Sequence, residues 1–360
     1  MRNFQQWVVR RGWTLGVLAA LALTMSAPLW AQQTLRVMSF GGSYQEAQRI
    51  SQFKPFEEAT GIKIVESTWF ADLGKVRAMV EAKNVTADVI LGDVAHAITG
   101  CNEGFLEPFD LTQFGDRKDY LPGTMWECGV PTELVSILYA YNEEKVPASW
   151  GAARPTTIAD MFDTKKFPGK RAFSVRALGG LPEKVLLADG VPPNKIYEVL
   201  GTEEGMRRLF AKLDSIRDDI VFYTSNAQPI QLLSSGEVVI AQSSNGRIQA
   251  AIMNDKKRFV AVWDGQVYYP DVWFIPKGGN KALAIKFLQF ITQPKTMAAL
   301  TNYIPYAPVR ISAVQYVSEA MKPYLTTSHD LAKGTLSNMT WWSEHEDEFN
   351  KRFQTWLAKK

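Results

Sequence analysis

Histidine and cysteine are scarce in this chain of 360 residues, which holds three of the first and two of the second. Metal sites draw largely on these two residue types, and acid–base catalysis draws most often on histidine. The segment His345-Glu346-Asp347 lacks the second histidine that a zinc-binding helix carries four residues after the first. The scarcity therefore argues against a metal centre and against an enzyme built on histidine.

Glycine-rich motifs for nucleotides and phosphates are also missing. No Gly-x-Gly-x-x-Gly follows a predicted strand, and Gly169-Lys170 is followed by Arg171 rather than by the Ser or Thr of a phosphate-binding loop. No Gly-x-Ser-x-Gly hydrolase elbow occurs. We therefore expect no cofactor.

Long apolar runs are nearly absent, and the run from Trp13 to Met25 spans about 13 residues, short of the roughly 20 that cross a bilayer. Three arginines precede this run, and small residues ending at Ala31 follow it. This order predicts a signal peptide over residues 1–31 that is removed after Ala31, with a membrane anchor as the alternative. Arg10-Arg11 leaves the Sec and twin-arginine export routes both open.

Net charge is absent once that leader is removed, because the segment contains three arginines and no acid and the whole chain carries +3. A neutral chain argues against nucleic acid or an anionic membrane surface as the partner. The remaining 329 residues exceed one ordinary hydrophobic core. We therefore expect two lobes.

Cys101 and Cys128 form an even pair in a chain that we expect to be exported. This predicts a disulfide closing a loop of about 27 residues, which contributes roughly 3–4 kcal/mol in the chain-entropy model. Two buried free thiols remain the alternative.

Strand and helix signals alternate along the chain, which predicts parallel β-sheet covered by helices. In the first part, the predicted strands and helices are Thr34–Ser39, Tyr44–Ala59, Lys63–Glu66, Leu73–Ala82 and Asp88–Leu91. Because ligands bind at the carboxyl ends of such strands, the turn Gly41–Tyr44, Thr68-Trp69 and Gly92-Asp93 form one candidate rim. Strand-like runs at Val135–Asn142 and Val267–Pro276 flank a second α/β unit, and we expect the tail from Ala313 to Lys360 to be mostly helical.

Several short segments, in order, resemble one known family. They are Phe40-Gly41-Gly42-Ser43-Tyr44-Gln45, Ala87-Asp88-Val89-Ile90, Gly104-Phe105-Leu106-Glu107-Pro108, the segment from Leu232 to Val238, and Asp271-Val272-Trp273-Phe274-Ile275-Pro276-Lys277-Gly278. Taken together, these segments make the chain similar to extracellular solute-binding proteins of the polyamine and 4-aminobutyrate group, which have the type II periplasmic binding fold.

This resemblance implies an α/β protein of two lobes, each a mixed, mainly parallel sheet flanked by helices, joined by two crossover hinge strands near Leu138–Asn142 and Val267–Asp271. The implied lobes are residues 32–138 plus 270–312 and residues 139–269 plus 313–360. It also implies a monomer in the periplasm that binds a small solute between the lobes and passes it to the membrane permease of an ABC importer. A chemoreceptor partner and a periplasmic enzyme are the alternatives to import.

Asp271 and Arg247 are the principal candidates for holding that solute. In the family, an acid at the place of Asp271 binds a ligand amine, and a carboxylate gains from an ammonium through a charge-assisted hydrogen bond. Arg247 follows Ser244-Asn245-Gly246 at a predicted helix start, where backbone N–H groups and a guanidinium both suit a carboxylate. The pair predicts a zwitterion such as 4-aminobutyrate.

Arg176 departs from the polyamine-binding members of the family, because the stretch Ser174–Gly180 has no acid where theirs carries several. This disfavours spermidine, although a polyamine binder stays the alternative. Arg176 itself is either a second carboxylate contact or an exposed side chain.

The remaining candidates are aromatic and polar side chains of the predicted cleft. Aromatic rings pack against ligand chains and ammonium groups, and hydroxyl groups donate hydrogen bonds. Asp93 is either an amine ligand or the N-cap of the following helix, and His96 on that helix is expected to be structural. The aromatic and hydroxyl candidates are Tyr44, Trp69, Tyr269, Tyr306, Ser43 and Thr132. Packing in the core is the alternative for each aromatic ring, and capping of a loop is the alternative for each hydroxyl.

Overall fold

The computed structural model describes residues 32–359. The predicted signal peptide, residues 1–31, lies outside the described residues. From Gln33 onward the chain forms one compact unit. No helix in the part that the structure describes has the length and apolarity needed to cross a membrane.

One mixed sheet of ten strands runs through residues 32–359. Its order is β2-β1-β3-β8-β4-β7-β5-β6, with β10 beside β8 and β9 beside β4. The β1 and β5 strands are parallel to both of their neighbours, whereas β8 runs antiparallel to β3 and β4. The strands are β1 (Thr34–Ser39), β2 (Lys63–Thr68), β3 (Val89–Asp93), β4 (Val130–Asn142), β5 (Arg171–Ser174), β6 (Ile220–Tyr223), β7 (Ile240–Ser244), β8 (Phe259–Phe274), β9 (Ala307–Pro308) and β10 (Thr335–Leu336).

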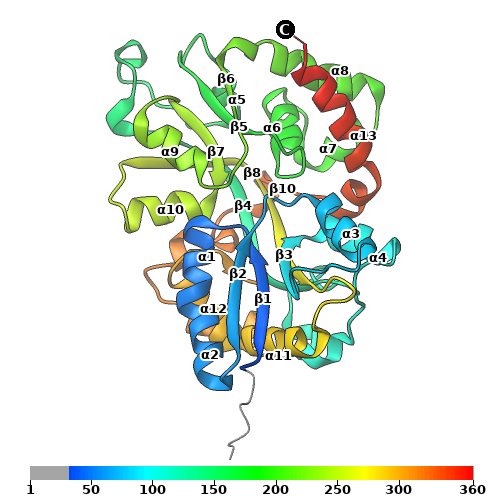
Figure 1. Ribbon diagram of the computed structural model, residues 1–360. Helices are drawn as coiled ribbons and strands as arrows, with labels where there is room; N and C mark the ends of the chain where they lie inside the picture. Colours follow the sequence, from blue (N-terminus) through cyan, green and yellow to red (C-terminus); the bar gives the residue numbers. More distant parts are fainter. Residues whose placement is uncertain (1–31, 360) are drawn as a thin grey trace, which may run out of the picture. The chain divides into compact units, whose positions relative to one another are not determined.

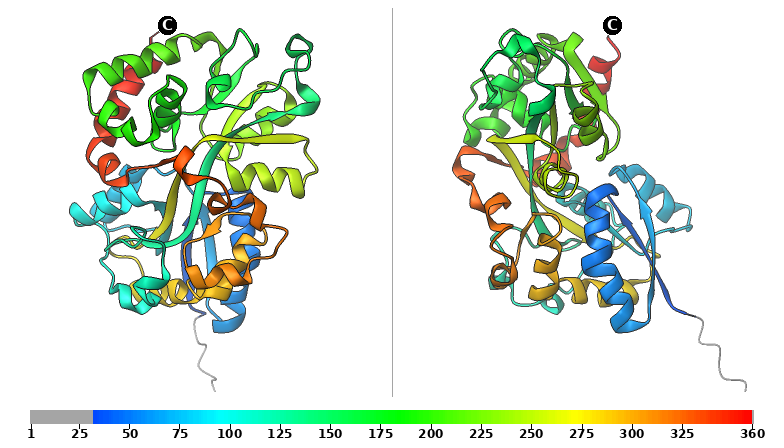
Figure 2. Two further views of the ribbon diagram at one scale, coloured as in Figure 1. Left: turned by 180° about the vertical axis from the view of Figure 1, so that it is seen from behind. Right: turned by 90° about the vertical axis from the view of Figure 1, so that its left-hand side faces the viewer.

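Helices pack on both faces of this sheet (Figures 1 and 2). The helices are α1 (Gly42–Gln48), α2 (Lys54–Thr60), α3 (Leu73–Glu81), α4 (Val94–Asn102), α5 (Ile158–Met161), α6 (Leu181–Ala188), α7 (Ile196–Leu200), α8 (Glu203–Asp214), α9 (Gln228–Ser235), α10 (Asn245–Met253), α11 (Lys281–Ile291), α12 (Pro294–Thr301) and α13 (Met339–Leu357). A π-helical turn, Arg49–Phe53, joins α1 to α2. The alternating β-α-β order predicted from the sequence is confirmed.

The unit has two parts, which we name the β1 half and the β7 half after their strands. The β1 half contains β1, β2 and β3 with α1–α4, α11 and α12, and the β7 half contains β5, β6 and β7 with α5–α10. The long strands β4 and β8 run between them (Figure 1). Each half has an apolar core; in the β1 half, for example, Phe56 of α2 packs edge-on against Phe287 of α11 with ring centroids 5.4 Å apart. The proposed lobe boundaries remain a prediction.

An irregularity interrupts the β4–β8 pair where these strands pass between the halves. Ile137 pairs with Val267 and Tyr139 pairs with Val262, so β8 carries extra residues at this point. Gly265 lies in this bulge with a φ of +68°, a conformation that glycine adopts without strain.

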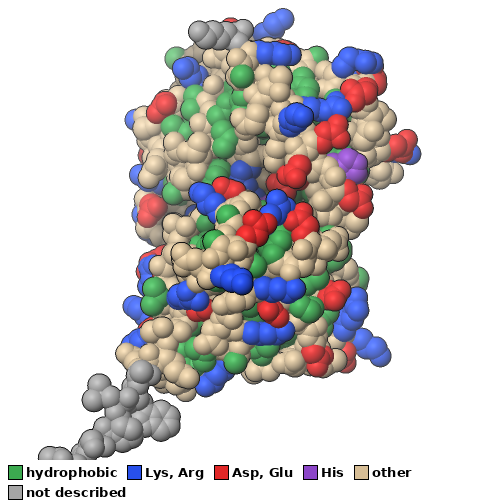
Figure 3. All heavy atoms as spheres, turned by 45° about the vertical axis from the view of Figure 1, so that its right-hand side comes forward, with side chains coloured by type: hydrophobic (Ala, Val, Ile, Leu, Met, Phe, Trp, Pro, Cys, Tyr) green, Lys and Arg blue, Asp and Glu red, His purple; other side chains and the backbone are tan. Residues whose placement is uncertain are grey.

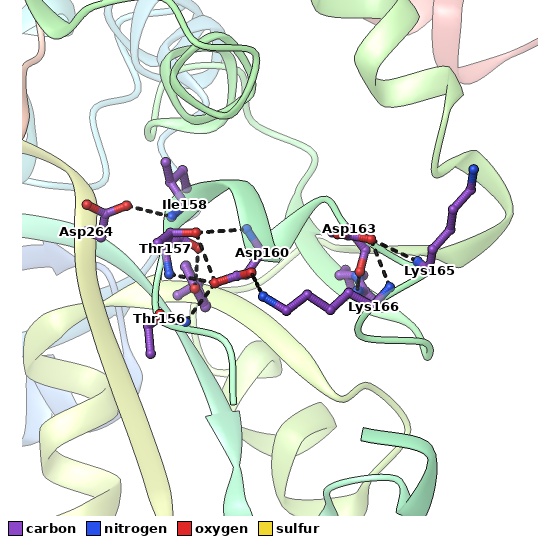
Figure 4. Close-up of polar contacts among 10 residues, drawn as sticks. Thr156, Thr157, Ile158, Asp160, Asp163, Lys165, Lys166 and Asp264 are labelled. Carbon is purple, nitrogen blue, oxygen red and sulfur yellow. Dashed lines mark hydrogen bonds and ion pairs between the residues drawn. The ribbon is translucent and has the colours of Figure 1, made fainter. Parts of the chain in front are cut away.

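Asp264 fixes that bulge to the start of α5 (Figure 4). Its Oδ2 accepts a hydrogen bond of 2.7 Å from the backbone N–H of Ile158. Thr157 and Asp160 form a capping box at the same helix start, which satisfies backbone donors there. The side chain of Asp264 therefore ties the bulge to the backbone of the β7 half.

The predicted disulfide is confirmed, since Cys101 and Cys128 are bonded with a Cα–Cα distance of 5.7 Å. It joins the end of α4 to the residues just before β4. The bond therefore ties α4, which begins directly after Asp93, to the start of β4, which pairs with β8.

Two predicted elements differ from the structure. The tail from Ala313 is helical only in α13, because 3-10 turns and the short strand β10 occupy the residues before it. Pro323 and Gly334 interrupt that stretch, and both disfavour a continuous helix. Strand β8 begins at Phe259, well before the predicted Val267, because the bulge at Gly265 hides the continuity of the strand.

Candidate functional site

A cavity lies between the two halves, at the carboxyl ends of strands β1, β3, β5 and β7. The volume of this cavity is about 60 Å³. One water needs roughly 10–15 Å³ by this measure, so the space suits a solute of only a few heavy atoms. Seven of the ten predicted site residues line it, namely Tyr44, Asp93, Arg176, Arg247, Tyr269, Asp271 and Tyr306.

Asp271 lies on β8 at the wall of this cavity and is 3% exposed. No basic side chain of the described residues lies within ion-pair distance of it. Burial raises the pKa of the Asp271 carboxyl well above its ordinary value, and the nearby carboxyls of Asp93 and Glu133 raise it further. A buried carboxyl in this setting gains strongly from an incoming cation.

Arg247 reaches the cavity from the first turn of α10 and is 5% exposed. Its Nη2 donates to the carbonyl oxygens of Phe40, at 3.2 Å, and Gly41, at 2.9 Å. Among the described residues, neither Nε nor Nη1 of Arg247 makes a hydrogen bond, and no carboxylate pairs with the guanidinium. Arg247 therefore contacts the β1 half from the β7 half through Nη2, and its Nε and Nη1 donors are available to an anion.

Arg176 and Asp93 form an ion pair across the cavity, with Nη2 and Oδ2 2.5 Å apart. The Arg176 guanidinium also lies 5.5 Å from the ring centroid of Phe70. Asp93 is the N-cap residue of α4, but its side chain accepts no capping hydrogen bond. These two charges neutralise each other, so Asp271 and Arg247 are left as the unpaired opposite charges of the cavity.

Glu133 is a neighbour of Asp271 that the sequence reasoning missed. Asp271 on β8 pairs in register with Asp93 of β3 on one side and with Glu133 of β4 on the other. Directly opposed residues of antiparallel strands place their side chains on one face. Three carboxyls therefore form a row across three strands, with Asp271 in the middle; below we call them the acid row.

Tyr44 and Tyr306 form an aromatic wall beside the acid row. Their ring centroids lie 4.7 Å apart in an edge-on arrangement. The Tyr44 hydroxyl donates to Glu133 Oε2 at 3.0 Å, and the Tyr306 hydroxyl shares a hydrogen bond of 2.8 Å with Ser244 Oγ. Ser244 thus uses its side chain on Tyr306 and leaves the N-terminus of α10 without a side-chain cap.

Comparison with known proteins identifies the group to which this arrangement belongs. Residues 51–327 match the family described as bacterial extracellular solute-binding protein. The chain belongs to this family. The gamma-aminobutyric acid-binding protein of Pseudomonas aeruginosa is 37% identical over 345 residues, which cover 95% of this chain and 96% of that one.

Solved structures agree with this assignment. The Atu4243-GABA receptor has a TM-score of 0.78 and 31% identity, covering 91% of this chain and 98% of its own. The MotA protein of Agrobacterium tumefaciens B6 in complex with glucopine has a TM-score of 0.83 and 28% identity, covering 90% of this chain and 99% of its own. The predicted type II periplasmic binding fold is confirmed, and the chain is a solute-binding protein of the kind that interacts with ABC permeases.

Three predicted residues of this solute-binding protein do not line the cavity. Trp69 stacks on Phe40, with ring centroids 6.2 Å apart, and its indole N–H donates to the carbonyl of Leu91 at 2.9 Å. Since Phe40 does line the cavity, Trp69 supports the wall from behind. Ser43 is exposed at the start of α1, and Thr132 is buried between Glu133 and the indole of Trp273.

His96 on α4 lies behind Asp93 rather than in the cavity. Its Nδ1 is 3.6 Å from Asp93 Oδ2, and its Nε2 is 3.2 Å from Glu346 Oε2 on α13. His96 also borders a groove between α3, α4 and α13 that is lined by Asp72, Arg77, Glu344, Glu346 and Asp347. Figure 3 shows side chains of both signs gathered across the middle of one face of the protein. Within residues 32–359 no cluster of His, Cys, Asp and Glu could hold a metal ion.

Proposed function

We propose that this protein captures 4-aminobutyrate, or an amino acid of similar length, as the periplasmic solute-binding component of an ABC importer. The leader predicted over residues 1–31 supports export to the periplasm. The mature chain would act as a monomer that binds its solute without transforming it, and it would have no nucleic acid partner.

One observation carries this proposal. Asp271 and Arg247 are buried in the same small cavity, and neither has an oppositely charged partner among the described residues. Burying an unpaired charge is costly, because the charge loses its water without gaining a counter-ion. A zwitterion with an ammonium at one end and a carboxylate at the other would compensate both charges at once.

The carboxylate end of the solute would lie against Arg247. A guanidinium offers a carboxylate two parallel hydrogen bonds, and its Nε and Nη1 donors are uncommitted. The first turn of α10, which has no side-chain cap, adds backbone N–H groups and the positive end of the helix dipole. Arg176 is the weaker candidate, since Asp93 already neutralises it.

The ammonium end would lie against Asp271, with the rings of Tyr44 and Tyr306 beside it. An aromatic face attracts a cation, and the acid row adds negative charge. The names of two relatives, a gamma-aminobutyric acid-binding protein and a GABA receptor, support the same ligand.

Putrescine is the competing candidate, because the acid row would also favour an amine. A diamine, however, would place its second ammonium near Arg247, where the two positive charges repel each other. The affinities of the protein for 4-aminobutyrate and for putrescine therefore distinguish the two proposals.

Thermal unfolding of the mature protein with added solutes tests the proposal. At about 100 times its dissociation constant, a ligand adds roughly 2.7 kcal/mol to the free energy of unfolding. We expect 4-aminobutyrate to raise the melting temperature, and putrescine and spermidine to leave it nearly unchanged. A rise with spermidine alone would refute the zwitterion proposal.

A further inference from the structure

Glu133 is buried against the cavity wall without reaching the cavity itself. It is 1% exposed and sits beside Asp271 in the acid row. The β4–β8 register shifts between Pro131 and Glu133, so Thr132 and Glu133 together face Asp271. Such a bulge re-aims side chains next to functional sites. Here it sets a second carboxyl beside the one that faces the solute.

The two carboxylate oxygens of Glu133 differ in their hydrogen bonds. Its Oε2 accepts from the hydroxyls of Tyr44 and Thr132, whereas Oε1 is buried without a hydrogen bond of good geometry, and the side-chain amide of Gln52 is the other polar group beside this carboxyl. No basic side chain of those residues forms an ion pair with Glu133. Burying a carboxylate without a counter-ion costs free energy, and protonation of one carboxyl of the pair Asp271 and Glu133 removes this cost.

Two neighbouring carboxyls without a counter-ion do not both ionise readily, because each charge disfavours the other. Burial raises the pKa of Glu133 to about 7, and that of Asp271 is also raised. The third member of the acid row, Asp93, differs because Arg176 neutralises it.

We propose that Asp271 and Glu133 hold one proton between them in the solute-free protein, and that the ammonium of the solute displaces this proton. The inference rests on the proposed function. The solute enters as R–NH₃⁺, the O–H bond of the shared proton breaks, and the proton passes to solvent. Glu133 thereby acts as a positioning residue that sets the charge of Asp271 without touching the solute.

Other titratable and charged groups face the pair from every side. Tyr44 comes from α1, Asp93 from β3, Tyr269 from β8 and Tyr306 from the segment before β9, while Arg176 and Arg247 come from the β7 half. Burial raises the pKa of each of the three tyrosines above its ordinary value, so these hydroxyls stay protonated near neutral pH. His96 lies behind Asp93, with its Nδ1 3.6 Å from Asp93 Oδ2, so the experiment includes a variant at this position.

Calorimetry of 4-aminobutyrate binding in buffers of different ionisation enthalpy counts the protons released. We expect release approaching one proton per solute near pH 6.5, and a dissociation constant that falls by up to tenfold for each pH unit between pH 6 and 7. Glu133→Gln should abolish most of this release and flatten the pH dependence. Glu144→Gln, an exposed change just after β4, is the matched control and should release protons like the wild type. His96→Gln should also keep the release.

Infrared spectroscopy of the wild-type protein gives a second readout, which does not depend on solute binding by any variant. The carbonyl stretch of a protonated carboxyl should be present near neutral pH and disappear when 4-aminobutyrate is added. Tight binding with no proton release and no such band overturns this inference and leaves the proposed function standing. Loss of release in His96→Gln with retention in Glu133→Gln overturns it as well, and failure of any short ammonium solute to bind overturns both.

Discussion

The guanidinium of Arg247 donates a 2.9 Å hydrogen bond to the carbonyl of Gly41, so a side chain of α10 closes over the turn that precedes α1. The same turn brings Gly42 against Arg247, where an added Cβ would lie 2.6 Å from Nη1. The contact links the β1 half to the β7 half at the cavity. A ligand that engages Arg247 would therefore stabilise the arrangement in which the halves meet.

Removing the charge of Arg247 should change selectivity as well as affinity. We expect Arg247→Gln to weaken 4-aminobutyrate binding by at least about 100-fold, because a charged, two-pronged carboxylate contact is lost. Arg247→Lys should recover part of this loss, since it keeps the charge without the fork. Putrescine binding should improve or stay the same in Arg247→Gln.

Titration calorimetry with both solutes measures these changes. Arg207→Gln, which alters an exposed arginine of α8, is the control and should behave like the wild type. Equal weakening of both solutes in Arg247→Gln would show that Arg247 supports the fold of the cavity rather than the carboxylate.

Gly42→Ala should impair binding through Arg247. Gly42 and Gly61 both have positive φ, at +61° and +72°, so alanine costs each position about 1 kcal/mol of stability. A Cβ at Gly61 meets nothing within 4 Å, whereas one at Gly42 meets Arg247. We expect both variants to lose a similar amount of stability, and Gly42→Ala alone to bind at least tenfold more weakly. Chemical unfolding measures the stability of each variant, and titration calorimetry measures its affinity. Equal affinities of the two variants would contradict this prediction.

The sequence predicted the elements better than it predicted the acid row. Asp271 lies in a recognisable segment, and Arg247 follows a predicted helix start, so local patterns were enough to propose both. Glu133 sits inside an apolar strand, and its position beside Asp271 depends on strand pairing and on the bulge at Thr132. Long-range register of this kind leaves no local signal in a single sequence.

Trp69 illustrates a different limit. Its place just after a predicted strand suggested that it lines the cleft, but Phe40 stacks on its ring and lies between Trp69 and the cavity. The tail before α13 was misjudged because Pro323, Gly334 and tertiary contacts, such as the pairing of β10 with β8, replace a continuous helix with 3-10 turns and a short strand.

Loss of the Cys101–Cys128 bond should lower stability without changing affinity. The bond closes a loop of 27 residues, which corresponds to about 3–4 kcal/mol in the chain-entropy model. Denaturant unfolding of the Cys101→Ser/Cys128→Ser double variant measures the change. Neither sulfur lines the cavity. A loss of 4-aminobutyrate affinity in a fully folded sample would show instead that the bond positions the site.

Lys184 should make stability rise with pH above neutrality. It is fully buried at the start of α6, where its Nζ donates to the carbonyl of Gly265 at 3.0 Å. Burial lowers the pKa of Lys184 to about 7, against the opposing effect of Glu183 and Asp264. Between that value and the unfolded pKa near 10.4, the unfolded chain binds the extra proton, so stability rises by up to about 1.4 kcal/mol per pH unit.

Lys184→Met removes this titration. The free energies of unfolding of the two proteins, measured from pH 7 to 9, should therefore diverge in slope, with the wild type rising more steeply. Parallel slopes would mean that Lys184 carries its ordinary charge in the folded protein.

The crystal structure of the mature protein with 4-aminobutyrate tests the central claim most directly. The account predicts the solute in the cavity between β1 and β7 halves, with its ammonium nitrogen roughly 2.7–3.2 Å from a carboxylate oxygen of Asp271 and its carboxylate on the Nε and Nη1 atoms of Arg247. A solute bound outside this cavity, or bound with its carboxylate toward the acid row, would contradict the account.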